Sequence, residues 1–121
     1  MKDNIILDKS KAFALRIIKL YQYLRNEKKE TVMSKQLLRS GTSIGANIHE
    51  ANYAHSKADF IAKFQIALKE CYETEYWIEL FVKSELLNRE IAKELYNQCG
   101  TIRRMLISSI NTAKENANDK K

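Results

Sequence analysis

Apolar residues recur at helical spacing in four stretches of the chain. In the first stretch the steps are four, three and four residues, which is the spacing of one face of an α-helix. The positions are Phe13, Ile17, Leu20 and Leu24. This pattern predicts a helix over residues 8–28, with residues 1–7 as a short lead. Asp8 or Ser10 is the expected cap, because short polar side chains accept hydrogen bonds from the first free amides.

The second stretch has a seam of small and polar residues. It predicts a helix over residues 32–53 that begins at Thr31 or Ser34. Gly41 and Gly45 lie one turn apart, and each costs about 1 kcal/mol relative to alanine in a helix interior. We expect another backbone to come close there and to recover that cost. A glycine-rich phosphate loop is the competing interpretation, but no strand precedes these glycines and the G-K-[ST] ending is absent. The seam positions are Met33, Leu37, Ser40, Ile44, Asn47, Ala51 and Ala54.

The third and fourth stretches predict helices over residues 57–84 and 88–115. Ser56 and Asn88 are the expected caps. The apolar face of the third helix is wide enough to contact more than one neighbour. It is interrupted by Glu75, whose carboxylate must be paired, hydrogen-bonded or at a subunit boundary. In the fourth helix the stripe passes through Gly100. Its members are Ile91, Leu95, Cys99, Ile102, Leu106, Ser109 and Ala113.

Four amphipathic helices with short connections can bury their apolar stripes only against one another. The sequence therefore predicts an all-α fold, an antiparallel up-down-up-down four-helix bundle that forms a single domain over residues 1–121. The composition agrees, because the chain has no proline and only three glycines, too few for a run of turns.

Charge is unevenly distributed along the chain. The net charge is +6, yet residues 57–85 carry four Lys or Arg against six Asp or Glu. A basic surface can bind nucleic acid; alternatively, the acidic segment complements its basic neighbours within the fold or in an oligomer. The two cysteines, Cys71 and Cys99, fall on apolar stripes and are expected to be free thiols in a reducing compartment. No signal peptide or membrane-length apolar run is visible, so we expect a cytoplasmic protein.

Two runs carry a family resemblance: SGTSIGANIHEA from Ser40 to Ala51, and SKADFIAKFQIALKECYETEYWI from Ser56 to Ile78. They resemble the four-helix-bundle family named after proteins encoded in 23S rRNA intervening sequences. The resemblance implies left-handed bundles that assemble as homopentamers. A related branch contains the basic accessory variability proteins of diversity-generating retroelements, which engage a reverse transcriptase and its template RNA. The motif positions, for which the resemblance implies structural roles, are Ser43, Ile44, Gly45, Asn47, Glu50, Ala51, Ser56, Asp59, Phe60, Lys69, Glu70, Glu73 and Trp77.

Asn47 and Glu50 are the first candidate site, because residues three apart share a helix face. They could form a buried polar pair that satisfies Lys69 or a backbone group across the contact between the second and third helices. They could also bind a small ligand or a partner. A carboxylate-bridged metal centre is not expected, since such bundles use Glu-x-x-His motifs and none occurs here. The acids and histidines considered for it are Glu50, Glu70, Glu73, Glu75, His49 and His55.

No catalytic residue or cofactor is predicted: His49 and His55 fall on opposite helix faces, and no nucleophile turn is visible. Tyr72, Tyr76 and Trp77 could stack on bases or pack in helix seams. The sequence thus favours a non-enzymatic, self-assembling scaffold or adaptor, expected to be a pentamer. The alternative is a basic accessory protein that binds structured RNA or a reverse transcriptase complex. Its candidate contacts, which could equally form a solvated surface, are Arg16, Lys19, Arg25, Lys28, Arg103 and Arg104.

Overall fold

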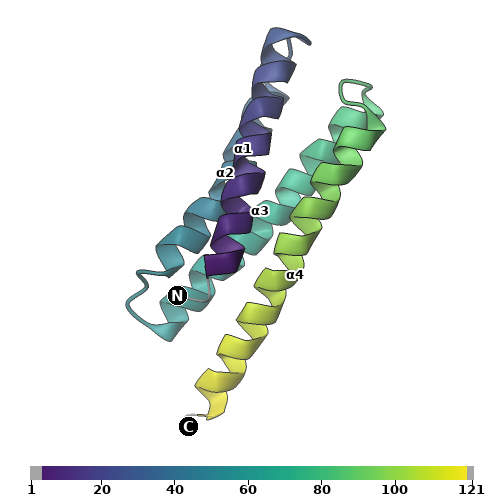
Figure 1. Cartoon of the computed structure of the whole chain (residues 1–121). Helices are drawn as coiled ribbons and strands as arrows, with labels where there is room; N and C mark the ends of the chain where they lie inside the picture. Colours follow the sequence, from purple (N-terminus) through teal and green to yellow (C-terminus); the bar gives the residue numbers. More distant parts are fainter. Residues whose placement is uncertain (1–3, 120–121) are drawn as a thin grey trace.

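The computed structural model describes residues 4–119, and within that range all regular structure is α-helical. The four helices are α1 (Asn4–Asn26), α2 (Met33–Ala51), α3 (Lys57–Lys83) and α4 (Arg89–Asp119). Consecutive helices run antiparallel (Figure 1), so the turns after α1 and α3 lie at one end of the molecule and the turn after α2 at the other. Each helix packs on its neighbours in sequence, and α1 also contacts α4. The predicted all-α, up-down-up-down four-helix bundle is confirmed.

The first helix begins earlier than the sequence pattern indicated. Residues 4–7 are helical, and Ile6 and Leu7 are buried. The expected non-helical lead is therefore wrong for residues 4–7, and residues 1–3 lie outside the described range. Asp8 and Ser10 are therefore not caps. The Ser10 hydroxyl instead donates a 2.7 Å hydrogen bond to the carbonyl of Leu7 inside the helix.

The start of α2 is capped by a residue that precedes both expected candidates. The carboxylate of Glu30 accepts hydrogen bonds from the amides of Val32 (3.2 Å), Met33 (3.1 Å) and Ser34 (2.7 Å). Burial raises the pKa of Glu30, but the three amide hydrogen bonds outweigh it, so the pKa is lowered overall. An acid in this place also faces the positive end of the helix dipole.

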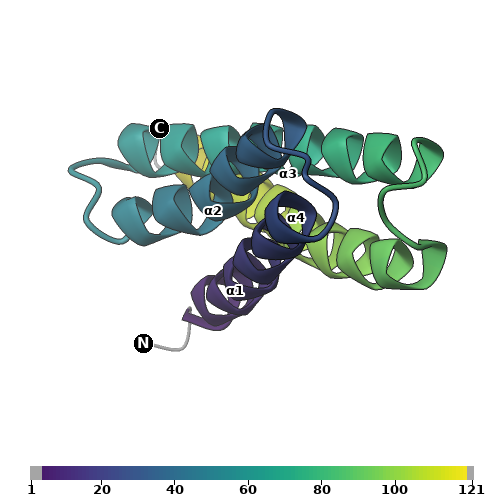
Figure 2. The same ribbon diagram turned by 90° about the horizontal axis from the view of Figure 1, so that it is seen from above.

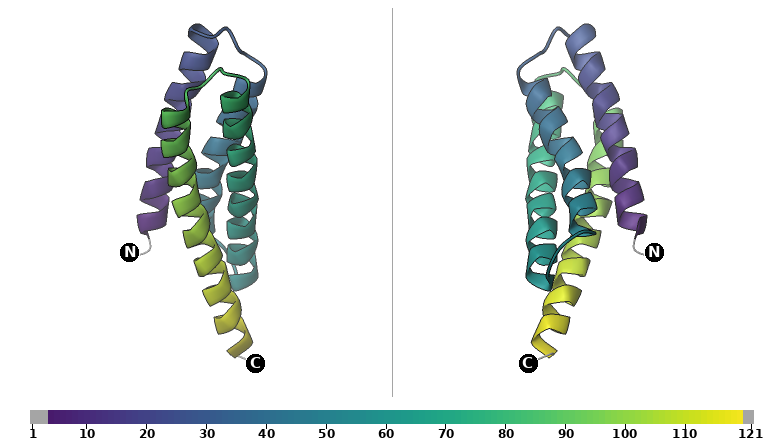
Figure 3. Two further views of the ribbon diagram at one scale, coloured as in Figure 1. Left: turned by 90° about the vertical axis from the view of Figure 1, so that its right-hand side faces the viewer. Right: turned by 90° about the vertical axis from the view of Figure 1, so that its left-hand side faces the viewer.

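The predicted starts of α3 and α4 are confirmed. The Ser56 hydroxyl accepts a 3.0 Å hydrogen bond from the amide of Asp59, and the Asn88 side-chain oxygen accepts a 2.8 Å bond from the amide of Ile91. The fourth helix passes through Gly100 as expected but continues to Asp119. Figure 3 shows its last turns extending beyond the other three helices.

Gly41 and Gly45 bring α2 close to α1. A Cβ atom built at Gly41 would lie 2.8 Å from Cγ2 of Ile17, and one at Gly45 would lie 3.0 Å from Oγ of Ser10. Both distances are shorter than ordinary van der Waals contact: a side chain at Gly41 would require Ile17 to move, and one at Gly45 would require Ser10 to shift by a few tenths of an ångström. The expected close approach is confirmed, and α1, which crosses the bundle at an angle (Figure 2), is the helix that makes it.

Candidate functional site

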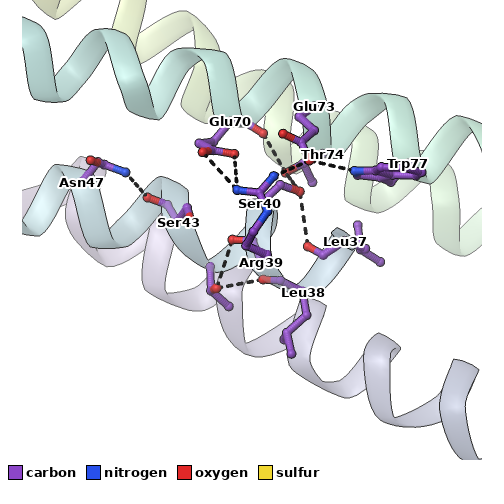
Figure 4. Close-up of polar contacts among 11 residues, drawn as sticks. Leu37, Leu38, Arg39, Ser40, Ser43, Asn47, Glu70, Glu73, Thr74 and Trp77 are labelled. Carbon is purple, nitrogen blue, oxygen red and sulfur yellow. Dashed lines mark hydrogen bonds and ion pairs between the residues drawn. The ribbon is translucent and has the colours of Figure 1, made fainter. Parts of the chain in front are cut away.

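Three side chains of the motif, Glu70, Glu73 and Trp77, meet Arg39, which precedes the motif, on the outside of the contact between α2 and α3 (Figure 4). Arg39 of α2 points its guanidinium at two carboxylates of α3, with Nη1 3.3 Å from Glu70 and Nη2 in an ion pair with Glu73. Trp77 donates a 3.0 Å hydrogen bond from its indole nitrogen to the same Glu73 carboxylate. We refer to Arg39, Glu70, Glu73 and Trp77 as the α2–α3 clamp.

The clamp is an electrostatic link between two helices. The hydrogen bond from Arg39, followed by the bond from Trp77, lowers the pKa of Glu73, and the same bond with Glu73 raises the pKa of Arg39. The Arg39 side chain is 48% exposed, so water screens the pair, and pairs of this kind contribute roughly 0–1 kcal/mol. The guanidinium bridges two carboxylates of α3, so it orients the two helices more than it stabilises them.

Two buried hydroxyls lie directly beneath the clamp. Oγ1 of Thr74 is 2.9 Å from Oγ of Ser40, and both residues are fully buried. Each hydroxyl also lies near a carbonyl of its own helix. Oγ1 of Thr74 is 2.7 Å from the carbonyl oxygen of Glu70, and Oγ of Ser40 is 3.3 Å from that of Leu37. Because an unpaired buried hydroxyl is costly, this pair favours a single register of α2 against α3.

Asn47 and Glu50 do not meet Lys69. The Asn47 amide donates a 2.9 Å hydrogen bond to the carbonyl of Ser43 within α2, and Glu50 forms a 3.0 Å ion pair with Lys63 of α3. Lys69 is exposed. The prediction of a buried polar pair satisfied by Lys69 or by a backbone group of the facing helix is therefore wrong: Glu50 is exposed, the backbone partner of Asn47 lies in α2, and the link from Glu50 to α3 is made by Lys63.

Three other motif residues lie in three different surroundings. Gly45 faces Ser10 of α1, as described above. Asp59 accepts a 3.3 Å hydrogen bond from the amide of His55 and so fastens the turn before α3. Phe60 packs on Phe64 with ring centroids 4.4 Å apart. The motif residues are thus spread along α2 and α3, with Gly45 turned toward α1, and they do not converge on one pocket.

Glu75, which interrupts the apolar face of α3, is paired with α4. Its Oε2 accepts a 2.9 Å hydrogen bond from Nε of Arg103, and its side chain is 8% exposed. The guanidinium of Arg103 also lies over the ring of Tyr72, 5.6 Å from its centroid. The expectation that this carboxylate needs a partner is confirmed, and Arg103 is part of the helix contact.

The two thiols are buried and free. The Sγ atom of Cys99 donates a 3.6 Å hydrogen bond to the carbonyl oxygen of Cys71 across the α3–α4 contact. Its hydrogen bond with Cys71, followed by burial, raises the pKa of the Cys99 thiol. A thiol in this state is a poor nucleophile, because the reactive form is the thiolate.

The six candidate nucleic-acid contacts do not form one face. Arg16 contacts Gln98 and Glu94 of α4, each at 3.1 Å. Arg25 lies over the ring of Tyr21, and Arg104 bonds to Thr101 in its own helix. Arg103 is engaged with Glu75. Three of the six, Arg16, Lys19 and Lys28, line the same groove.

Among residues 4–119, no group of three or more His, Cys, Asp or Glu side chains is placed to hold a metal ion. None of the helices in that range combines the length and apolar character needed to cross a membrane.

The geometry defines the class of protein as an antiparallel four-helix bundle whose second and third helices are joined by a polar seam. The chain belongs to the 23S rRNA-intervening sequence protein family, whose model matches residues 2–108. It is also similar to the crystal structure of a protein with unknown function from the S23 ribosomal protein family of Bacteroides thetaiotaomicron. The two share 57% sequence identity with a TM-score of 0.87, over 88% of this chain and 98% of that one. The comparison with curated proteins gives no match.

Proposed function

We propose that this protein is a non-enzymatic bundle that assembles into a homopentamer and serves as a scaffold or adaptor. The observation that carries the proposal is the outer face of α3, where Tyr72 and Tyr76 lie one turn apart and are 51% and 54% exposed. Tyrosine is enriched in subunit contacts relative to the rest of the protein surface, and a contact there would bury both rings. The number five comes from the homopentamers that the family resemblance implies.

The side chains that could perform chemistry support the non-enzymatic part of the proposal. Glu70 and Glu73 are held by Arg39, and Glu75 is held by Arg103. Both histidines are exposed, and both cysteines are buried. A general acid and base need a shared position next to a substrate, whereas these carboxylates and thiols lie in separate helix contacts and the histidines face solvent.

Light scattering on the purified chain at micromolar concentration tests the assembly. We expect about 70 kDa, five times the chain mass of 14.1 kDa. Tyr76→Glu should lower the mass toward that of one chain, because a charge is costly in an apolar contact. Tyr53→Glu is the matched control, since Tyr53 is 72% exposed in the turn after α2, away from the α3 face. A monomeric wild-type chain would refute the proposal.

A second candidate function is binding of structured RNA, alone or together with a reverse transcriptase. It is supported by the exposed cations of α1 and the turn after it, which outnumber the exposed acids there; these are Lys9, Lys11, Lys19, Arg25, Lys28 and Lys29. A gel shift with a structured RNA at several salt concentrations tests it, because phosphate contacts weaken as salt rises. Failure to shift the RNA at low salt would exclude this function.

A further inference from the structure

A groove of about 980 Å³ opens between the second half of α1 and the turn that joins α3 to α4. Its apolar lining includes Leu20 of α1, Leu86 of the turn, and Ile91 and Leu95 of α4. In Figure 3 this end of the molecule shows α1 and α4 beside each other with the α3–α4 turn close by. The groove lies where the bundle is least filled, because the α1–α4 contact is the least extensive of the four helix contacts.

Ile91 is the clearest sign that this surface is not simply solvated. Its spacing predicted a buried stripe position, but it is 41% exposed and faces the groove, while Ala92 occupies the core position. The prediction for Ile91 is therefore wrong for the single copy. An aliphatic side chain left half in water at the edge of an apolar groove becomes buried when another molecule fills the groove.

The rim of the groove is strongly cationic. Five basic side chains line it, against the single carboxylate of Glu85; they are Arg16, Lys19, Lys28, Lys83 and Arg89. Arg16 is paired with Glu94, and Lys83 lies 3.9 Å from Glu79. Within the part of the chain that the structure describes, no ion pair is found for Lys19, Lys28 or Arg89. These three charges are available to an occupant.

We propose that the groove binds an acidic amphipathic peptide segment of a partner protein. Aliphatic side chains of the segment would pack on Leu86 and Ile91, and its Asp or Glu residues would reach Lys19, Lys28 and Arg89. This is the helix-in-groove mode of recognition, with charge complementarity at the rim. The inference rests on the scaffold role proposed above, for which it names the kind of client.

The lining favours such a segment over the other two occupants. Nucleic acid without paired bases needs aromatic platforms for stacking, and the groove lining contains one aromatic ring, Tyr23, among aliphatic residues. A second copy of this chain would need an acidic apolar stripe. The acids of α3 at positions 70, 73 and 75 are already bound to Arg39 and Arg103, so they do not supply one.

The test is selection of peptides from a random displayed library on the full wild-type chain. The enriched peptides are then measured by fluorescence anisotropy on the wild type and on the groove variant Lys19→Glu/Arg89→Glu. The control is Lys57→Glu/Lys114→Glu, which changes the net charge equally. Lys57 begins α3 and Lys114 lies in the last turns of α4, so both lie at the end of the bundle opposite to the groove. Both side chains are exposed.

We expect enriched peptides in which Asp or Glu flank aliphatic residues, with affinity that falls as salt rises. Affinity should fall at least about tenfold in the groove variant, and it should change little in the control. Peptides that are not acidic, equal losses in both variants, or no enrichment above an empty support would overturn the proposal.

Two further measurements on the same variants distinguish the other occupants. If a single-stranded RNA binds the wild type and the control but not the groove variant, the groove belongs to nucleic acid and the proposal is overturned. If light scattering shows that only the groove variant loses its oligomeric mass, the groove is a contact between copies, which also overturns it. A monomeric wild type that still binds acidic peptides would refute the scaffold assembly alone, so the two failures are distinguishable.

Discussion

Replacing Gly41 with alanine tests the physical basis of this bundle, which is the close approach of α1 to α2. The added methyl group would lie 2.8 Å from Cγ2 and 3.0 Å from Cγ1 of Ile17. Ile17 is fully buried and branched at Cβ, so it has no free end that could swing away. The two helices must move apart, or the core must repack around them.

Two opposing contributions set the size of the effect. Alanine is favoured over glycine in a helix interior by about 1 kcal/mol. An extra methyl group in a filled core costs about 1–3 kcal/mol, and two contacts at or below 3.0 Å with a rigid side chain put this case at the upper end. We therefore expect Gly41→Ala to lower the free energy of unfolding by about 2 kcal/mol.

Gly100→Ala is the matched control. A methyl group at Gly100 would meet only Nη2 of Arg103 and Nη1 of Arg104, at 3.2 and 3.3 Å. Arg103 is held to Glu75 through Nε and not through Nη2, so both nitrogens can give by the few tenths of an ångström that are needed. The helix propensity gain then dominates, so this variant should be stabilised by up to about 1 kcal/mol. Urea denaturation followed by circular dichroism measures both, at one protein concentration because assembly adds to apparent stability.

Ile17→Ala completes a double-mutant cycle. Alone it should cost about 2–5 kcal/mol, but it removes both carbon atoms that lie nearest the new methyl group. In the Ile17→Ala background, Gly41→Ala should therefore become neutral or stabilising, with a coupling energy of about 1–3 kcal/mol. If Gly41→Ala is as stable as the wild type, or if the two substitutions are additive, the close approach does not explain the glycine.

Substitutions test three further features of the fold, which are the Glu75–Arg103 pair, the α2 cap and the backbone at Glu85. Arg103→Ala should cost about 3 kcal/mol in urea denaturation because the buried Glu75 carboxylate loses its partner, and Glu75→Leu/Arg103→Leu should recover most of that loss. Glu30→Ala should cost about 1 kcal/mol at neutral pH through loss of the α2 cap. The pKa of Glu30 is lowered from 4.5 in the folded state, so the unfolded state binds more protons between the two pKa values. The wild type therefore has this contribution in full above about pH 4.5 and loses it as pH falls; an unchanged acid slope in Glu30→Ala would contradict the cap. Glu85→Gly should raise the melting temperature by about 4 °C, because Glu85 has a φ of 63°, which glycine adopts at little cost; a lower melting temperature would contradict this.

The sequence predicted the helices well and their starts less well, for a reason that α1 illustrates. Asp8 and Ser10 are cap-forming residue types, so they were interpreted as a helix start. The burial of Ile6 and Leu7 shows that the helical spacing extends to the N-terminal side of Phe13, with the small Ser10 at the position that faces Gly45. The cap-forming residue types predicted a helix start at Asp8 or Ser10, whereas the apolar spacing continues back to Ile6. Burial of Ile6 and Leu7 in the core stabilises the longer helix.

The polar seam could be predicted in outline, but its pairings required the register of α2 against α3. In an antiparallel pair, each step along one helix corresponds to one step back on the other. The Ser40–Thr74 contact therefore places Glu50 opposite residues near position 64, which is why Lys63 and not Lys69 is its partner. Lys69 lies about 9 Å further along the axis. Arg39 was missed because its partners are 31 and 34 residues away in the sequence.

These contacts divide the bundle into a side of fixed register and a side that is only lightly joined. On the α2 side, Gly41 and Gly45 fit against α1, and the buried Ser40–Thr74 pair and the α2–α3 clamp hold α3. On the other side, α1 reaches α4 through the half-exposed Arg16 and a sparse apolar contact. Because α1 is anchored to α2, a groove between α1 and α4 leaves the contacts of fixed register intact. A binding surface at this place therefore costs the fold least, which is the physical reason to expect one there.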